Sequence, residues 1–342
     1  MITRIPSLVI LVLSVIAVTT GVGWAQVLKI AALPPDGTPW MKEMRKRAML
    51  IEKGTAGRVQ FKFYPGGVMG NDQSVLRKIR IGQLQGGGVA SGALAGLYPD
   101  SQTYGLPMLF HSYEEVDYVR SRMDDVLLKG LEQHGFVVFG VAESGFAYLM
   151  SKRPIRRVED LEGLKVWVPQ GDPISRTFFE AAGRSPIPLP LSDVLTGLQT
   201  GLIDTAGTPP IGAIALQWHT AVKYLTETPL MYTYGMLLFD QKTFRRIAPG
   251  DQGIVREVLE QGFRELNKQN RSDNENAKQA LRNQGITFVR PSPEDLDNLN
   301  AIAIRATQHL AAQNIYTPAV LKMLHDYLNA ARKSHDSKSS RS

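Results

Sequence analysis

Cysteine is absent from all 342 residues, which excludes disulfides and anchoring through a lipidated N-terminal cysteine. The chain also lacks a large excess of positive or negative charge. Lysine and arginine total 39 against 32 aspartate and glutamate, and much of the resulting net charge of +7 comes from Arg4 and from the basic residues of 331–342. The rest of the chain is too weakly basic for a nucleic-acid-binding surface.

Motifs for covalent or metal chemistry are missing as well. The six histidines are scattered and form no His-x-x-His or His-Glu-x-x-His pair, so we expect no metal site. Ser91 and Ser144 stand outside any Gly-x-Ser-x-Gly motif. The stretch "GGGVASGAL" fits neither a dinucleotide-binding motif nor a P-loop, and we interpret it as a strand-end turn, at Ser91 and Gly92, where the backbone must come close to something.

One long apolar run does occur, at the N-terminus. Arg4 precedes "IPSLVILVLSVIAV", and Gly23 and Ala25 supply the small residues of a cleavage site. This order is typical of a secretory signal peptide, and the run is shorter than the about 20 residues that span a bilayer. The sequence therefore predicts a signal peptide over residues 1–25, cleavage after Ala25, and a mature chain in the periplasm. A membrane anchor is the alternative interpretation.

Strand and helix patterns alternate in the remaining chain. "VLKIAALPP" and "RVQFKFYPGG" are typical of strands, and each is followed by a helical pattern. A helix that stops at Gly82 is followed by a strand and a turn of small residues, and a similar series returns around Gly201. We interpret the two series as two α/β lobes with a ligand cleft at the ends of their strands.

The boundaries of the lobes follow from two predicted crossovers, at 137–155 and 224–240, and from a long polar helix from Asp251 to about Asn283. The predicted division of the chain is lobe I at 26–148 plus about 234–282, lobe II at 149–233 plus about 283–330, and a disordered basic tail at 331–342.

Aromatic and polar side chains gather at the predicted strand ends and crossovers, without a nucleophile. Aromatic walls with a few placed polar groups suit a small-molecule cleft. The aromatic candidates are Trp40, Phe146, Tyr148, Trp167 and Tyr234. The polar candidates beside them are Glu143, Gln170 and Asp172.

Several motifs in a fixed order carry a family resemblance. They are "FYPGGVMGNDQSVLRKIRIGQLQGG", "LPMLF", "SKRPIRRVEDLEGLKVWVP" and "LQTGLIDTAGTPP", and a long polar helix follows them. Over residues 27–330 the chain resembles the solute-binding component of TRAP transporters, the DctP family. The resemblance implies an α/β fold of the two-lobed periplasmic binding protein architecture. It would have two mixed or mostly parallel sheets with flanking helices, a cleft between the lobes and a long helix spanning both domains.

The resemblance also implies a function. The lobes would close on a small organic solute and deliver it to the membrane permease subunits of a TRAP transporter. No ATP, cofactor or covalent chemistry is implied, and we expect a monomer that binds no nucleic acid.

The site is where this sequence departs from the family. The family's "Gly-Leu-Lys-Ile-Arg-Val-Pro" stretch holds an arginine that binds the solute carboxylate through two parallel hydrogen bonds. Trp167 occupies that position here, Ala147 replaces a second common arginine, and Thr208, before Pro209, replaces a common asparagine. We therefore expect a neutral, aromatic or cationic solute, with Trp167 stacking on it.

Two expectations about charged residues follow. Glu143 and Asp172 are candidate partners for an amine or a hydroxyl group of the solute. Arg176 or Arg184, in contrast, would restore an anion site if either side chain reached the cleft.

Two other functions stay open at the level of sequence. A secreted α/β enzyme would use Glu143 and Asp172 as its acid and base. A sensor partner would bind a solute in the same way but signal instead of supplying a permease.

Overall fold

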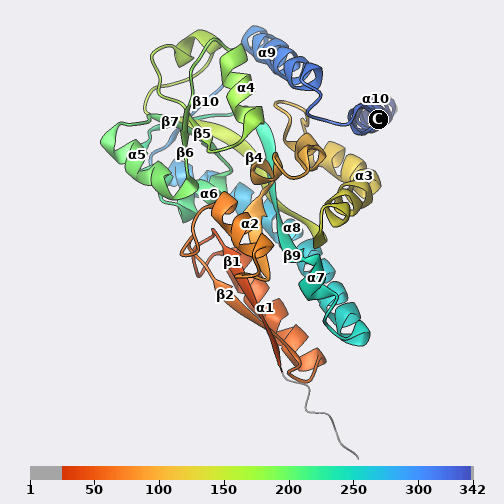
Figure 1. Ribbon diagram of the computed structural model, residues 1–342. Helices are drawn as coiled ribbons and strands as arrows, with labels where there is room; N and C mark the ends of the chain where they lie inside the picture. The colour runs from red at the N-terminus through yellow and green to blue at the C-terminus, as the bar shows by residue number, and fades with distance from the viewer. Residues whose placement is uncertain (1–24, 340–342) are drawn as a thin grey trace, which may run out of the picture.

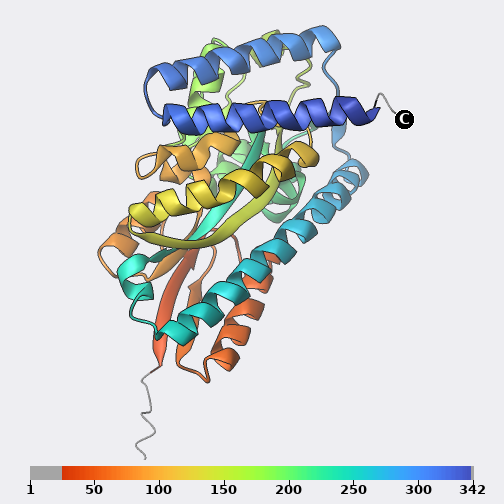
Figure 2. The same cartoon turned by 90° about the vertical axis from the view of Figure 1, so that its right-hand side faces the viewer.

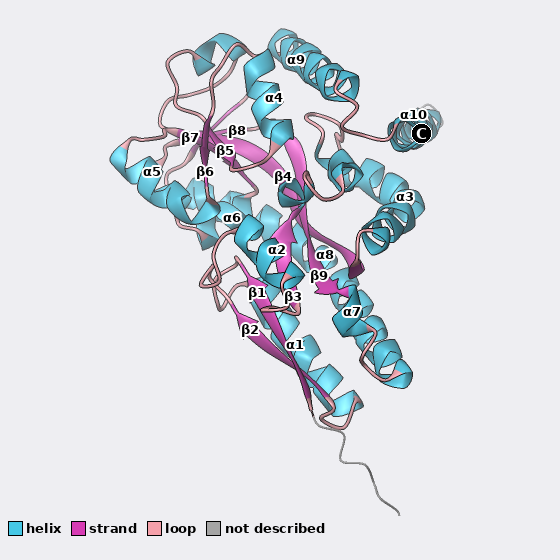
Figure 3. Ribbon diagram, in the orientation of Figure 1, coloured by secondary structure: helices cyan, strands magenta, loops and turns pink. Residues whose placement is uncertain are grey.

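A computed structural model describes residues 25–339 of the chain. Its strands run through the middle of the molecule and helices cover them on the outside (Figure 3). Within the described residues, an eight-stranded sheet has the order β10-β8-β4-β9-β3-β1-β2, with β7 also paired to β4, and β5 and β6 form a separate pair. The predicted α/β fold is confirmed.

The strands are short except for the two that cross between the lobes. They are β1 (Gln26–Ala32), β2 (Val59–Tyr64), β3 (Gly86–Ala90), β4 (Phe136–Ser151), β5 (Trp167–Pro169), β6 (Ile187–Leu189), β7 (Thr205–Thr208), β8 (Tyr224–Thr226), β9 (Met231–Asp240) and β10 (Thr287–Val289).

The α-helices vary from a single turn to 35 residues. They are α1 (Pro39–Gly54), α2 (Asp72–Arg80), α3 (Tyr113–Gln133), α4 (Pro173–Ala181), α5 (Val194–Thr200), α6 (Pro210–Ala215), α7 (Gln241–Phe244), α8 (Pro249–Asn283), α9 (Pro293–Ala312) and α10 (Pro318–Ser339). Short 3₁₀ helices are η1 (Ser91–Leu94), η2 (Pro99–Gly105), η3 (Val158–Leu161), η4 (Leu191–Asp193) and η5 (Trp218–Ala221).

The first lobe has the predicted β–α–β–α–β order. Strand β1 pairs in parallel with both β2 and β3. Helix α1 begins where Thr38 accepts a hydrogen bond from the backbone of Met41, and α2 begins where Asn71 accepts one from Ser74. These caps satisfy amides that the helix leaves free, so each helix starts directly after a strand-end turn.

Strands β4 and β9 join the lobes. The first part of β4 pairs antiparallel with β9 in the first lobe, and its last residues, Tyr148–Ser151, pair with β7 and β8 in the second. The two sheets that the sequence predicts are therefore continuous through β4. Figure 1 shows the first lobe, with α1, β1 and β2, at the bottom and the second, with α5 and β5–β7, at the top.

Helix α8 spans both lobes, as the family resemblance implied, and packs on α1 of the first and α6 of the second. It runs diagonally along one side of the molecule (Figure 2). Asn267, Asn270 and Asn274 face β4 and satisfy the backbone around an irregularity in its pairing. Asn274 also accepts a hydrogen bond from the backbone amide of Ile211 in α6. One face of α8 therefore binds both the crossover strand β4 and the second lobe.

The C-terminal helix differs from the expectation in two ways. Helix α10 packs on α3 and η2 of the first lobe, whereas residues up to 330 were expected in lobe II (Figure 2). It also continues to Ser339, where a disordered tail was expected from residue 331. Ala331 is buried, and Arg332 donates to Glu115 and to the carbonyl of Leu109, so packing and an ion pair extend the helix.

Candidate functional site

A cavity of about 420 Å³ lies between the lobes, lined from the loop after β1 and from β3, β4 and β9 on one side and from β5, α4 and α6 on the other. It has the size of a small-molecule site. Most of the candidates from the sequence line it: Trp40, Ser91, Gly92, Glu143, Trp167, Gln170, Asp172, Thr208, Pro209 and Tyr234.

Two of the predicted aromatic site residues do not line the cavity. Alternation along β4 turns Ala147 and Leu149 to it, so Phe146 and Tyr148 face away. Phe146 packs on Tyr113, and Tyr148 lies beneath the ammonium group of Lys278.

The arginines that were candidates for an anion site are not at the cavity either. Arg176 is on the exposed face of α4, and Arg184 follows that helix, partly buried, without lining the cavity. Among the described residues that do line it, none is lysine, arginine or histidine.

The family resemblance leads one to expect a carboxylate clamp at three positions. These three positions come together on neighbouring strands. Ala147 and Thr208 lie on the paired strands β4 and β7, Trp167 lies on β5, and all three line the cavity. The indole N–H of Trp167 donates to the carbonyl of Leu189 at 3.0 Å, and its ring packs edge-on against Trp218. Trp167 therefore presents an apolar wall whose only donor is already used.

The glycine run of β3 lets the backbone come close to its neighbours, as the sequence predicted, and the neighbours are side chains of two helices. A β-carbon on Gly88 would lie 2.9 Å from the ring of Trp40, and one on Gly87 would lie 2.4 Å from a methyl group of Val75. The backbone of this strand thus comes close to side chains of α1 and α2. These glycines let the helices pack and place Trp40 in the cavity wall.

Glu143 lines the cavity, but its carboxylate is held by other groups. Arg271 of α8 donates to both of its oxygens, at 2.8 and 2.9 Å, and the hydroxyl of Tyr232 donates at 2.8 Å. Arg120 lies 3.7 Å away and also donates to Tyr232. Burial raises the pKa of Tyr232 far above its ordinary value, so it stays a donor. Glu143 therefore joins α3, β4, β9 and α8.

Asp172 begins α4 as its cap. Its oxygens accept from the backbone of Ile174 at 3.0 Å and from the hydroxyl of Ser175 at 2.6 Å. Burial raises the pKa of the Asp172 carboxyl, and these hydrogen bonds oppose that shift only in part.

Asp72 and Gln102 are cavity residues that the sequence analysis did not select. Asp72 is the first residue of α2, and burial raises its pKa to about 7 although the backbone amide of Ala90 stabilises the charged form. Gln102 of η2 is 1% exposed and donates to the carbonyl of Gly92. The signal available for Asp72 was its place after a strand-end turn, the criterion used to select Gln170 and Asp172.

The rims of the lobes touch each other beside the cavity. Asn71 donates to the side chain of Gln170 at 3.4 Å, and a β-carbon on Gly92 would lie 3.3 Å from Asp172. The turn at 169–173, next to Trp167, therefore contacts the start of α2 and of η1 in the opposite lobe.

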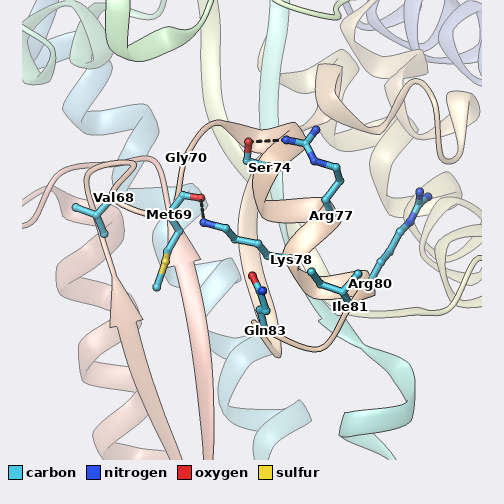
Figure 4. Close-up of a pocket in the computed structure, with 9 residues that line it drawn as sticks. All are labelled: Val68, Met69, Gly70, Ser74, Arg77, Lys78, Arg80, Ile81 and Gln83. Atoms are coloured by element: carbon cyan, nitrogen blue, oxygen red, sulfur yellow. Dashed lines mark hydrogen bonds between the residues drawn. The ribbon is translucent and has the colours of Figure 1, made fainter.

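A second depression lies on the outer surface of the first lobe and shares no residue with the cavity. It lies beside α2, where Arg77 reaches Ser74 and Lys78 reaches the carbonyl of Met69 (Figure 4). Val68 and Ile81 are exposed on it. The cations of α2 thus lie at this outer groove and not in the cleft.

The described part of the chain offers no group of three or more histidine, aspartate or glutamate side chains that could hold a metal ion. Between residues 25 and 339, no helix has the length and apolar character required to cross a membrane.

Two lobes joined by crossing strands and a spanning helix, with a cavity between them, are the architecture expected of a solute-binding protein. Residues 30–314 match the DctP family, described as bacterial extracellular solute-binding protein, family 7. The chain belongs to this family, whose members in TRAP transporters are periplasmic.

Named relatives show what other members bind. The C4-dicarboxylate-binding periplasmic protein DctP of Rhodobacter capsulatus is 28% identical over 270 residues, 76% of this chain and 79% of that protein. The 2,3-diketo-L-gulonate-binding periplasmic protein YiaO of Escherichia coli is 27% identical over 219 residues, 62% of this chain and 66% of that protein.

Solved structures share the fold. A TRAP periplasmic solute-binding protein from Ochrobactrum anthropi is 26% identical with a TM-score of 0.79, covering 91% of this chain and 97% of that one. One from Desulfovibrio salexigens, with bound orotic acid, is 20% identical with a TM-score of 0.83, covering 89% and 99%.

Proposed function

We propose that this chain is the periplasmic receptor of a TRAP transporter and that its solute is neutral, aromatic or cationic instead of a carboxylate held by arginine. The observation that carries the proposal is the lining of the cavity. Ala147, Trp167 and Thr208 stand there at the positions where the family resemblance leads one to expect two arginines and an asparagine.

A carboxylate would find no counter-charge in this cavity. Burying an anion without a cationic partner is strongly unfavourable, and arginine is the side chain that binds a carboxylate through two parallel hydrogen bonds. Trp167 has no free donor, and Ala147 has no polar side-chain atom. The charged groups that do line the cavity are the carboxylates Asp72, Glu143 and Asp172. The named relatives bind acids, so the proposal places this chain apart from them within one family.

Contacts of the acidic residues weigh against the enzyme alternative. Glu143 is paired with Arg271, and Asp172 caps α4, so neither is a free acid or base beside the other. Recovery of permease subunits with the protein from membranes would distinguish a transport receptor from a sensor partner.

The proposal includes the predicted cellular location and oligomeric state of the chain. The signal peptide at 1–25 falls outside the described residues apart from Ala25, and an N-terminus at Gln26 in the secreted protein would establish the cleavage. A monomer that closes on its solute needs no second copy to complete the cavity.

Native and denaturing mass spectrometry of the protein purified without added solute tests the function directly. We expect a small neutral, aromatic or amine compound to leave on unfolding. A bound carboxylate would contradict the proposal.

Trp167→Ala gives a second test with the compound so identified. We expect the affinity to fall by about five- to thirtyfold, because loss of one stacking or cation–π contact removes about 1–2 kcal/mol. Tyr118→Ala, which removes an aromatic ring outside the cavity, is the matched control and should leave affinity unchanged. Equal affinity of Trp167→Ala and the parent chain would refute the stacking role.

A further inference from the structure

Three acceptor side chains surround one short backbone segment, Ala90–Gly92, at the cavity. The amide of Ala90 faces the carboxylate of Asp72. The carbonyls of Ser91 and Gly92 accept from the side-chain amide of Gln102, at 3.2 and 2.9 Å. Asp172 reaches the same segment from the second lobe, 3.3 Å from the position of a β-carbon on Gly92. Each of these three side chains lines the cavity.

Two oxygen atoms in this group have no hydrogen-bond partner. They are Oδ1 of Asp72 and Oε1 of Gln102, and both are buried. A buried acceptor without a donor is costly, and a native structure usually supplies one.

A counter-charge is missing at the same place. Within residues 25–339, neither Asp72 nor Asp172 has a lysine, arginine or histidine within salt-bridge distance, whereas Glu143 in the same cavity is paired with Arg271 and Arg120. Two carboxylates from opposite lobes thus approach one segment with nothing positive between them.

We propose that the solute carries a primary ammonium group that is bound between Asp72 of the first lobe and Asp172 of the second, with Oε1 of Gln102 as the third acceptor. The inference rests on the proposed function and narrows it to one class of solute. An ammonium group has three N–H donors and a full positive charge, which match three acceptors of which two are carboxylates.

The remainder of the cavity describes the rest of the solute. Trp40 and Trp167 form walls on opposite lobes, and Leu149, Phe179 and Leu191 add apolar surface. The solute therefore has a compact apolar or aromatic body beside its ammonium group, of a size that fits about 420 Å³.

Electrostatics connects this site to closure of the lobes. Burial raises the pKa of both Asp72 and Asp172, which means that closing the cleft without a cation disfavours their charged forms. An ammonium group stabilises both charged carboxylates in the closed form. The solute therefore favours closure by its differential binding to the closed state.

Matched trios of compounds test the inference on the full mature chain. The three compounds of a trio share one carbon skeleton and differ in the functional group, which is an amine, an alcohol or a carboxylic acid. The first trio is 2-phenylethylamine, 2-phenylethanol and phenylacetate. The second is cyclohexylmethylamine, cyclohexylmethanol and cyclohexanecarboxylate, and the third is butylamine, butanol and butyrate. Binding is measured by calorimetry and thermal shift in amine-free buffer at about pH 8, which lies above the pKa of about 7 of Asp72.

We expect an amine to bind at least tenfold more tightly than its alcohol, and its acid not to bind. Asp72→Asn and Asp172→Asn should each lose at least tenfold in amine affinity. Asparagine keeps the side-chain size and also caps helices well, so α4 should still fold, as circular dichroism would verify. Asp297→Asn removes an equal charge from the exposed face of α9 and should leave affinity unchanged.

Other outcomes separate this inference from the proposed function. If an alcohol binds as well as its amine, or if both cavity variants keep their amine affinity, the inference is wrong while a non-carboxylate receptor remains supported. If no amine binds, or if calcium chloride replaces the amines in stabilising the protein, the inference is also wrong. If the acids bind most tightly, both the inference and the proposed function fail.

Discussion

Asp72 illustrates how one residue depends on its surroundings. In the sequence it is an acidic residue at a helix start, a common and favourable place for a solvated carboxylate. In the folded chain it lines the cavity between the lobes, and burial raises its pKa to about 7. The other ionisable side chains that line the cavity are Glu143, Asp172, Tyr232 and Tyr234, and the cations of α2 lie at the outer groove of Figure 4.

This shift predicts a pH dependence for the stability of the solute-free protein. Between the ordinary value of 3.8 and about 7, the folded chain keeps a proton on Asp72 that the unfolded chain has lost. The stability contributed by this group is therefore fully present below pH 3.8 and is lost as the pH rises through about 7.

Melting temperatures of the parent chain and of Asp72→Asn, measured in amine-free buffers from about pH 4 to about pH 8, isolate this contribution because other carboxylates change equally in both. The parent should lose stability relative to the variant as the pH rises, until the difference levels off above about pH 7. A difference that is constant across the range would contradict the shift.

Among the elements, α10 is the one whose place the sequence analysis did not foresee. The spacing of apolar residues in a helix identifies its buried face and not the element that covers that face. The structure lays this face on α3, and Leu324 is fully buried there.

Leu324→Ala should therefore lower the free energy of unfolding by about 2–5 kcal/mol, because it removes buried methyl groups and leaves a cavity. Lys322→Ala, at an exposed position two residues earlier, should change it by no more than about 0.5 kcal/mol. Chemical denaturation measures both. Equal effects of the two substitutions would mean that α10 does not pack on the first lobe.

Strand β4 shows a second effect at the scale of elements. Phe146 and Tyr148 are aromatic and lie at the predicted crossover, yet the strand alternates and turns them away from the cavity. The sequence located the crossover, but only the pairing of β4 with β7 and β9 decided which of its residues line the cavity.

The whole molecule consists of two lobes that are joined by β4, β9 and α8 and that touch again across the cleft between Asn71 and Gln170. The hydrogen bond between Asn71 and Gln170 is long and exposed, so it contributes little to closure by itself. We therefore expect the solute-free protein to sample open forms and the solute to close it.

Spin labels can measure this closure without background, because the chain has no cysteine. Val68→Cys in the first lobe and Leu202→Cys in the second lie at exposed positions outside the cavity. The compound identified by mass spectrometry should shorten and narrow the distance distribution between the labels. An unchanged distribution at saturation would show that binding does not close the lobes.

The sequence by itself determined the α/β class, the crossover region, the spanning helix and the family, because local periodicity, turn residues and ordered motifs are properties of neighbouring residues. It also selected Trp167 as a candidate site residue, and Trp167 lines the cavity. Only the tertiary structure showed that Glu143 is paired with Arg271 and that Arg176 faces solvent. It also showed that Asp72 and Asp172 approach the segment Ala90–Gly92 from opposite lobes. These facts depend on contacts between residues far apart in the chain, which no local pattern records.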